Sequence, residues 1–349
     1  MTLTISRDDL VSDSVSNEEL FLCETPLIEN IQHCLDKLPA YTKKSVHASL
    51  VATSSLYFVR CICNSELPIS RDTLTSYIKL IETSVQKGTE AVQQASSLAL
   101  GAVSHRIDLS IYLTEWLPHL RHKTNFTARR GWTMALGHIE LQSYITLLLA
   151  LCESILSEKD IEAKRNAIQS VGLIFSRLTY WEDPAIVTRI WSTLTDCLDD
   201  YTVDQRGDVG SWIRIAACEA LVPLMKFSSQ ENVEKTIGKI LRLCVEKMDR
   251  VRTVAGRTLC AIVPQWPVSE ESLLEFVGTA KQTGDELFST PSKVYSSMAS
   301  LLSLECYRKE MLTGFLISAG GLGESLVPTS SLYQIDVDSD CFDCLGRLS

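Results

Sequence analysis

The sequence is short of positive charge. It contains 33 Lys and Arg residues against 43 Asp and Glu residues, which gives a formal net charge of −10. Because binding to nucleic acid depends on Lys and Arg contacts to phosphate, this balance argues against a nucleic-acid-binding protein. It argues equally against binding to an anionic membrane surface. A partner with an acidic surface would need a local basic patch or an apolar face.

Long apolar runs are also lacking. Met1 to Val15 contain Arg7 and three aspartates but no apolar segment, so we expect no secretory signal. The longest apolar stretch, around Tyr144 to Cys152, is too short to span a bilayer. The sequence therefore predicts a cytoplasmic protein with no membrane anchor.

Patterns that carry chemistry are scarce. No His-x3-His pair or nucleophile elbow is present, and Gly320-Gly321 is not followed by the Lys-Ser/Thr of a phosphate-binding loop. Cys61 and Cys63 have the wrong spacing for a zinc site, and the CxxC of Cys341 and Cys344 has no second CxxC and no His within forty residues to complete one. We expect no catalytic residues, no cofactor and no metal, and therefore no enzyme.

The twelve cysteines are mostly single residues on apolar helix faces. This usage predicts buried free thiols in a reducing compartment. The examples on the clearest apolar faces are Cys152, Cys218, Cys244 and Cys260.

A nine-residue phrase recurs along the chain, from Ile213 to Leu221 and from Val251 to Leu259. It places an apolar residue first, a basic residue second, small residues fifth and eighth, and an aliphatic residue ninth. The first, fifth, eighth and ninth positions share one face of a helix. Small residues there let another helix approach closely, and a stack of such helices buries a face that a single helix cannot.

Weaker copies begin at Val92, Ala128, Ala163 and Tyr307, so successive starts are 36, 35, 50, 38 and 56 residues apart. HEAT and armadillo repeats are about 40–47 residues long. The spacing predicts an all-α, HEAT/armadillo-like α-solenoid, a right-handed superhelix of helix pairs. The two widest gaps predict repeats with inserted loops. The alternative is an irregular helical domain with Ala-rich helices.

Composition divides the chain into three segments. Residues 1–25 are polar and acidic and are predicted to be a disordered lead-in. Residues 26–327 form the predicted HEAT-like helical repeat domain, and residues 328–349 an irregular acidic tail. The longest break inside the array, Asp199 to Ser211, has two glycines and four aspartates and predicts a loop with special backbone needs. Ser211 is the expected N-cap of the helix that follows.

That loop resembles a known family. Asp200 to Arg214 is similar to the Asp-Tyr-Thr…Arg-Gly-Asp-Val-Gly-Ser-Trp-Val-Arg segment of tubulin-folding cofactor D. Thr127 to Gly137 and Gly314 to Leu326 resemble two further segments of that family. The resemblance covers roughly residues 30–327 and concerns the family's C-terminal HEAT region only. The N-terminal array of the family is absent, and the chain departs from the pattern after Val327.

The resemblance implies a chaperone scaffold. It implies capture of β-tubulin, work with cofactors C and E and an Arf-like small GTPase, and assembly or disassembly of the αβ-tubulin heterodimer. GTPase activation would then be a property of the cofactor complex, and the protein would be cytoplasmic and associated with the cytoskeleton. The alternative is a generic HEAT-repeat adaptor for another cytosolic protein.

The loop supplies the first candidate binding residues: Arg206, Asp208 and Trp212, which an exposed loop would present to tubulin or a cofactor. The structural alternative is that Gly207 and Gly210 allow a tight turn while Asp208 caps the next helix or pairs with Arg206 or Arg214.

A basic group supplies the second set: Arg121, Lys123, Arg129 and Arg130. In an acidic chain this local reversal of charge could meet an acidic tubulin surface and steer the encounter. The alternative is a solvated helix face with one arginine that stacks between repeats. We expect both sets to face the partner and, being two repeats apart, to act independently.

Overall fold

The computed structural model describes residues 46–320 apart from 182, 267 and 269. The predicted lead-in (1–25) and tail (328–349) lie outside the described residues, as do both ends of the predicted repeat domain. The chain divides into two compact units, Met1–Asp108 and Leu109–Ser349.

The first unit contains α2 (Val46–Asn64), α3 (Arg71–Lys87) and α4 (Glu90–Ser104). The side chain of Ser70 caps α3 by accepting a hydrogen bond from the Thr73 amide at 3.1 Å. Helix α4 packs against both α2 and α3. The unit is therefore a small stack of helices around the phrase that begins at Val92.

The second unit is also helical. Its elements, in chain order, are η2 (Ser110–Tyr112), α5 (Leu113–Trp116), η3 (Leu117–Arg121), α6 (Phe126–Ala135), α7 (Ile145–Ser157), α8 (Ile161–Arg177), α9 (Pro184–Cys197), β1 (Val203–Asp204), β2 (Gly207–Asp208), α10 (Gly210–Leu224), η4 (Met225–Phe227), α11 (Gln230–Cys244), α12 (Asp249–Ile262), η5 (Val263–Gln265), α13 (Glu271–Thr283), α14 (Asp285–Ser289), α15 (Pro291–Ala299), η6 (Ser300–Ser303) and α16 (Glu305–Ser318).

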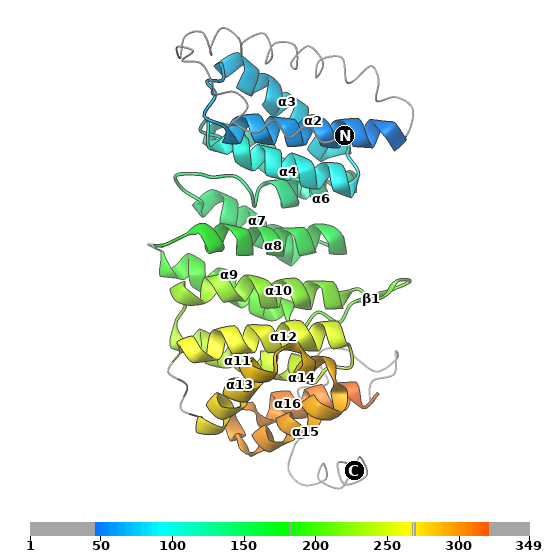
Figure 1. The fold of residues 1–349 in the computed structure, drawn as a ribbon, viewed down its shortest axis with the longest axis vertical. Helices are drawn as coiled ribbons and strands as arrows, with labels where there is room; N and C mark the ends of the chain where they lie inside the picture. The colour runs from blue at the N-terminus through cyan, green and yellow to red at the C-terminus, as the bar shows by residue number, and fades with distance from the viewer. Residues whose placement is uncertain (1–45, 182, 267, 269, 321–349) are drawn as a thin grey trace, which may run out of the picture. The chain divides into compact units, whose positions relative to one another are not determined.

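These helices form two layers. Helices α6, α8, α10, α12 and α14 contact one another in that order, and α7, α9, α11 and α16 form the second layer (Figure 1). Each of α7, α9 and α11 also packs against the helix that follows it in the chain. The fold is all-α and HEAT-like, as the spacing of the phrase predicts. The right-handed sense of the superhelix stays a prediction.

Small side chains bring neighbouring helices together. Ala217 and Ala255, the fifth residues of the two clearest phrases, are fully buried. A Cβ added at Gly172 of α8 would lie 3.0 Å from the Cα of Ala220 on α10, and a Cβ at Gly256 would overlap the Phe288 ring. The close approach expected from the phrase is confirmed.

The two wide gaps in the spacing differ. The first contains a loop between α9 and α10, as predicted. The second contains α13, α14 and α15, so the expectation of an inserted loop is wrong there. The copy that begins at Tyr307 lies on α16, which packs against α11 and not against the layer of α12. A helical period predicts which face is buried, but it does not predict which helix covers that face.

The cysteines within the described residues are free thiols. Cys152, Cys218 and Cys244 are buried, whereas Cys260 is half-buried and Cys61 and Cys306 are exposed. Burial raises the pKa of Cys152 to about 11 and that of Cys218 to about 12. These thiols are protonated and unreactive at neutral pH, which fits a packing role.

Candidate partner-binding site

The loop between α9 and α10 contains a short hairpin. Val203 pairs with Asp208 and Asp204 with Gly207 in antiparallel fashion, and the hairpin projects from the end of α10 (Figure 1). Gly207 has φ +97°, a value that side-chain-bearing residues rarely adopt. The special backbone needs predicted for this loop are confirmed. The strand pairing is not foreseeable, because strands of two residues show no alternation.

The carboxylate of Asp208 is hydrogen-bonded within its own part of the chain. One carboxylate oxygen accepts a hydrogen bond from the Ser211 amide at 3.0 Å, and the other accepts one from Arg214 at 2.7 Å. Ser211 lies inside α10, where its hydroxyl donates to the Asp208 carbonyl at 2.6 Å. The prediction of Ser211 as N-cap is therefore wrong: Val209 is the N-cap, and the carboxylate of Asp208, one residue earlier, accepts the hydrogen bond from the Ser211 amide. The structure places Asp208 as in the structural alternative.

Arg214, the second residue of its phrase, is fully buried. It donates to Asp208 and, at 2.9 Å, to Glu246 in the turn before α12. Arg252, the equivalent residue one repeat later, is also fully buried and donates to the carbonyls of Glu246 and Phe288 at 2.7 and 2.9 Å. The basic residue of the phrase therefore connects the turn before its own helix to the next repeat, through a turn residue for Arg214 and through a carbonyl of α14 for Arg252. We call these residues the buried arginine ladder.

Arg129 belongs to this ladder. Its side chain donates to the His122 carbonyl at 2.6 Å and to Glu158 at 3.1 Å, and it is only 7% exposed. The prediction that Arg129 is an exposed binding residue, whose charge could be reversed without harm to the fold, does not hold. The reason is that its buried guanidinium donates to acceptors in two turns, one of which is the buried carboxylate of Glu158.

The rest of the basic group lies at the surface but is not a bare positive patch. Arg121 forms an ion pair with Glu153, and Lys123 is exposed. Arg130 donates to both oxygens of Asp160, at 2.9 and 2.5 Å. Burial acts to raise the pKa of Asp160, but Arg130 and the Ala163 amide hold it below its ordinary value.

Glu162 joins the two candidate sets. It forms an ion pair with Arg130 and accepts a hydrogen bond from Arg206 at 2.9 Å. Arg206 also donates to Asp204 at 2.7 Å and lies 5.0 Å from the centre of the Trp212 ring. The structure therefore brings Arg130 and Arg206 together on one carboxylate despite their separation in sequence. Their independence in partner binding stays a prediction.

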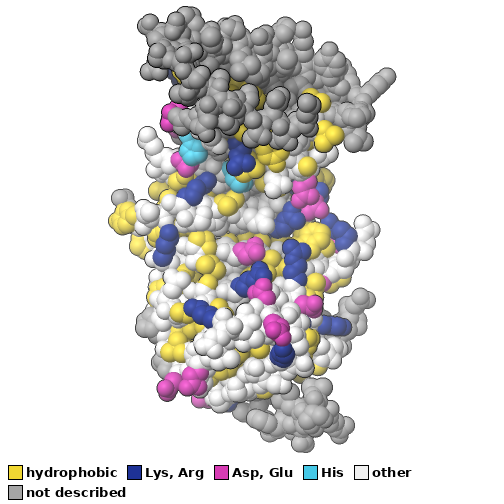
Figure 2. Space-filling view, in the orientation of Figure 1, with side chains coloured by type: hydrophobic (Ala, Val, Ile, Leu, Met, Phe, Trp, Pro, Cys, Tyr) yellow, Lys and Arg dark blue, Asp and Glu magenta, His cyan; other side chains and the backbone are white. Residues whose placement is uncertain are grey.

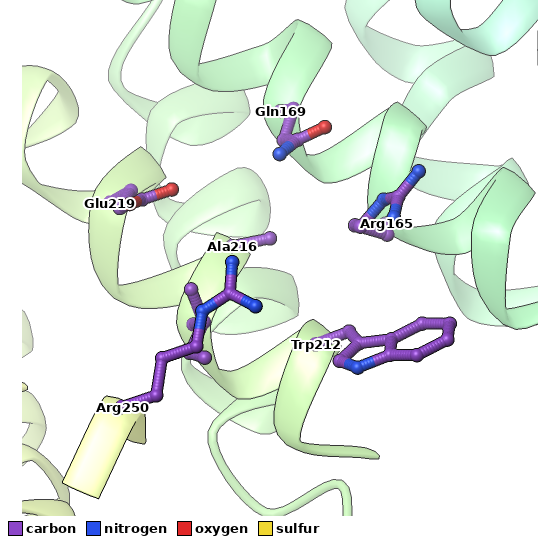
Figure 3. Close-up of a pocket in the computed structure, with 7 residues that line it drawn as sticks. Arg165, Gln169, Trp212, Ala216, Glu219 and Arg250 are labelled. Carbon is purple, nitrogen blue, oxygen red and sulfur yellow. The ribbon is translucent and has the colours of Figure 1, made fainter. Parts of the chain in front are cut away.

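A pocket of about 290 Å³ opens beside Trp212. Its lining residues come from α8, α10 and α12 and are Arg165, Gln169, Trp212, Ile215, Ala216, Glu219 and Arg250 (Figure 3). Trp212 is half-buried, Ile215 and Ala216 are buried, and Arg250 is exposed. The pocket is therefore a small apolar floor with charged side chains around it.

The charges around the pocket are mostly guanidinium groups. Arg165 donates to Asn166 at 3.1 Å, and its guanidinium carbon is 6.0 Å from the Trp212 ring centre. Arg250 forms no ion pair with any described residue. Glu219 is the one acidic residue in the lining; partial burial raises its pKa, while Arg250 and Arg257 act to lower it. The site combines an aromatic surface with two cations.

Sequence reasoning identified Trp212 and Arg206 but missed Arg165 and Arg250. A signal for Arg250 exists in the repeat itself: Trp212 and Arg250 each stand immediately before the first residue of a phrase. Equivalent positions in successive repeats lie side by side in a solenoid. A comparison of that position between repeats would therefore have predicted that Trp212 and Arg250 lie close together.

A family model and a curated protein match the chain. Residues 234–334 match the family model described as tubulin folding cofactor D C terminal. Tubulin-specific chaperone D of Dictyostelium discoideum is 25% identical over 286 residues, covering 64% of this chain. The chain is thus similar to tubulin-folding cofactor D. The resemblance indicated by the sequence motifs is thereby confirmed.

The relationship to cofactor D covers part of a longer protein. The chain spans about a fifth of the length of the curated relative, 19%. The family match begins within α11, so Arg250 is the pocket residue that lies inside it. The hairpin and Trp212 precede it.

The face that carries the pocket has mixed charge. Lys and Arg side chains alternate with Asp and Glu side chains over α8, α10 and α12 in Figure 2. Among the described residues, no group of three or more His, Cys, Asp and Glu side chains is arranged to hold a metal ion. None of the helices described is long and apolar enough to cross a membrane.

Proposed function

We propose that the chain is a non-catalytic binding module of tubulin folding that contacts β-tubulin through the hairpin and the pocket beside it, which we call the Trp212 face. The relationship to a protein named tubulin-specific chaperone D supports the partner. The observation that carries the site is that Arg206, Arg165 and Arg250 surround a half-buried Trp212. Trp and Arg dominate the energetics of protein interfaces.

The architecture suits this role. The buried residues Arg129, Arg214 and Arg252 hold the turns of successive repeats in place. The helices that carry the Trp212 face are therefore rigidly positioned. Arg206 stands at the rim, held by Asp204 and Glu162. Its guanidinium can exchange these exposed partners for carboxylates of an acidic protein at small cost, because exposed ion pairs contribute little.

We propose further that cofactors C and E and an Arf-like small GTPase are partners of the complete assembly. In this proposal the chain takes part in assembly and disassembly of the αβ-tubulin heterodimer, in the cytoplasm and in association with the cytoskeleton. Any GTPase activation would arise in the cofactor complex, with this chain as a scaffold. The resemblance to cofactor D supports these partners.

The test is direct binding of purified αβ-tubulin to the immobilised full chain, with serum albumin as an acidic control protein. We expect saturable tubulin binding and, after cross-linking and mass spectrometry, links from β-tubulin to peptides of α10 or the hairpin. Tubulin retention no higher than that of albumin would contradict the proposal. The generic adaptor would then be the better interpretation.

A charge-reversal variant tests whether tubulin contacts the Trp212 face. Arg206→Glu should weaken tubulin binding, and more so at low salt, where screening is weak. Lys235→Glu is the matched control, because Lys235 is an exposed residue of α11 in the other layer. Equal effects of the two variants would show that net charge, and not the Trp212 face, controls the encounter.

A further inference from the structure

The pocket beside Trp212 has a size that limits its occupant. Its volume of about 290 Å³ is at the lower end for small-molecule sites, which extend to roughly 1,000 Å³. Its lining side chains come from three helices (Figure 3). One or two side chains of a bound peptide fit such a space, whereas a large cofactor does not.

The lining determines the chemistry of the occupant. Arg250 reaches from the first turn of α12 toward α10 in Figure 3, and no described carboxylate forms an ion pair with it. The indole of Trp212 offers an apolar surface, and Arg165 lies beside that ring. A guanidinium binds carboxylates through two parallel hydrogen bonds. A carboxylate next to an apolar or aromatic side chain therefore complements this pocket.

We infer that the pocket docks an acidic segment of a partner protein, with a carboxylate on Arg250 and the adjacent apolar or aromatic side chain on Trp212. This inference deepens the proposed function, because it names the kind of segment that the Trp212 face binds. Charge complementarity carries it: two arginines line the pocket of a chain whose net charge is −10.

Glu219 affects the affinity of the pocket for an acidic segment. Its carboxylate lies near Arg250 and lowers the positive potential that an acidic segment meets. Removal of that charge should tighten binding of an acidic segment. A residue with a purely structural role would not produce a gain, so Glu219→Gln separates recognition from folding.

The experiment uses the full chain and two fluorescent peptides. One peptide alternates Glu and Tyr, and the other has Gln in place of each Glu. Fluorescence anisotropy gives the dissociation constants at low and at physiological salt. We expect the Glu peptide to bind at least about tenfold more tightly than the Gln peptide, since charge-assisted bonds to Arg are lost in the second.

Three variants test the geometry. Arg250→Glu and Trp212→Ala should each weaken binding of the Glu peptide by about tenfold or more, and Glu219→Gln should tighten it by a few-fold. Lys235→Glu, which changes the net charge equally on the other layer, should leave binding within about twofold. Far-UV circular dichroism and melting curves establish that each variant is folded.

Equal binding of the two peptides would overturn the inference, as would unchanged binding in folded Arg250→Glu and Trp212→Ala variants. The proposed function is judged separately. If tubulin binds the parent and the pocket variants equally, the pocket inference fails and the pocket is not part of the tubulin contact, while tubulin as the partner stands. If the Glu peptide binds as expected but tubulin does not, the pocket inference stands and the partner must be a different acidic protein.

Discussion

The two faces of α10 differ in what the arginines beside them do: on one face an arginine is buried and paired, and on the other an arginine is exposed and has no described ion pair. On the inner face, Arg214 is fully buried between Asp208 and Glu246, next to the equally buried Ala217. On the outer face, Trp212 and Glu219 line an open pocket, where Arg250 of the neighbouring helix forms no described ion pair. An arginine with its acceptors already provided stabilises the fold, whereas an arginine without them is available to a partner.

The same difference separates the members of the predicted basic group. Arg129 and Arg130 are adjacent in sequence, but Arg129 points into the buried ladder while Arg130 pairs with Asp160 and Glu162 nearer the surface. Adjacent residues of a helix project about 100° apart, so they meet different neighbours. Density of positive charge in the sequence is therefore a poor guide to a binding surface in a helical array.

The largest effect should come from a charge on the inner face. Ala217→Asp places a carboxylate at a fully buried position of α10, and we expect it to destabilise the local repeat by about 4 kcal/mol or more. Glu219→Ala, on the outer face of the same helix, should stay within about 0.5 kcal/mol of the parent. Hydrogen exchange of the α10 amides measures both. Similar protection in the two variants would show that the faces are assigned wrongly.

The second-largest loss of stability should follow from substitution of a residue of the buried arginine ladder. Arg214→Met leaves Glu246 buried without its cation, which costs about 3–5 kcal/mol. Arg250→Met removes the same kind of side chain from the outer face and should change stability by no more than about 0.5 kcal/mol. Urea unfolding followed by circular dichroism compares them. A mild effect of Arg214→Met would mean that water replaces the guanidinium.

Acid should weaken the turns that the ladder holds. Burial acts to raise the pKa of Asp200, but Lys164 and Thr202 lower it, and the pKa of Asp160 is lowered as well. A carboxyl whose pKa is lower in the folded state than its ordinary value of about 3.9 stabilises the fold above that pH. This contribution disappears as the pH falls through the folded-state pKa.

The measurement is urea unfolding at a series of pH values from neutral to acid. We expect stability to fall once the pH drops below about 4, and to fall less steeply in Lys164→Met, where Asp200 has lost its cation. Identical pH dependence of the parent and Lys164→Met would show that this ion pair contributes nothing to acid sensitivity.

The smallest effect should be the coupling across Glu162. Because Arg130 and Arg206 share this carboxylate, the effects of Arg130→Ala and Arg206→Ala should not add: the double variant should lose more stability than the sum of the single losses, since each single variant still leaves Glu162 one cation. Glu162→Gln should abolish the coupling. Melting temperatures of the four proteins in the cycle measure it. Strict additivity would mean that solvent screens the two pairs from each other.

Much of the fold follows from the sequence. The repeated phrase predicts the buried faces of α8, α10 and α12 because a helical period and small residues are local properties of the chain. The glycines and aspartates between α9 and α10 predict a specialised loop for the same reason. The motif in that loop also indicates the relationship to cofactor D.

Tertiary structure decided the rest. It placed α16 beside α11, made Arg129 and Arg214 structural, and joined Arg130 to Arg206 through Glu162. It also assembled the pocket from α8, α10 and α12, whose residues Arg165, Trp212 and Arg250 lie far apart in the sequence. A local pattern states which face of a helix is buried. The partners of each charge depend on which distant turns and helices meet, and that is fixed only when the repeats stack.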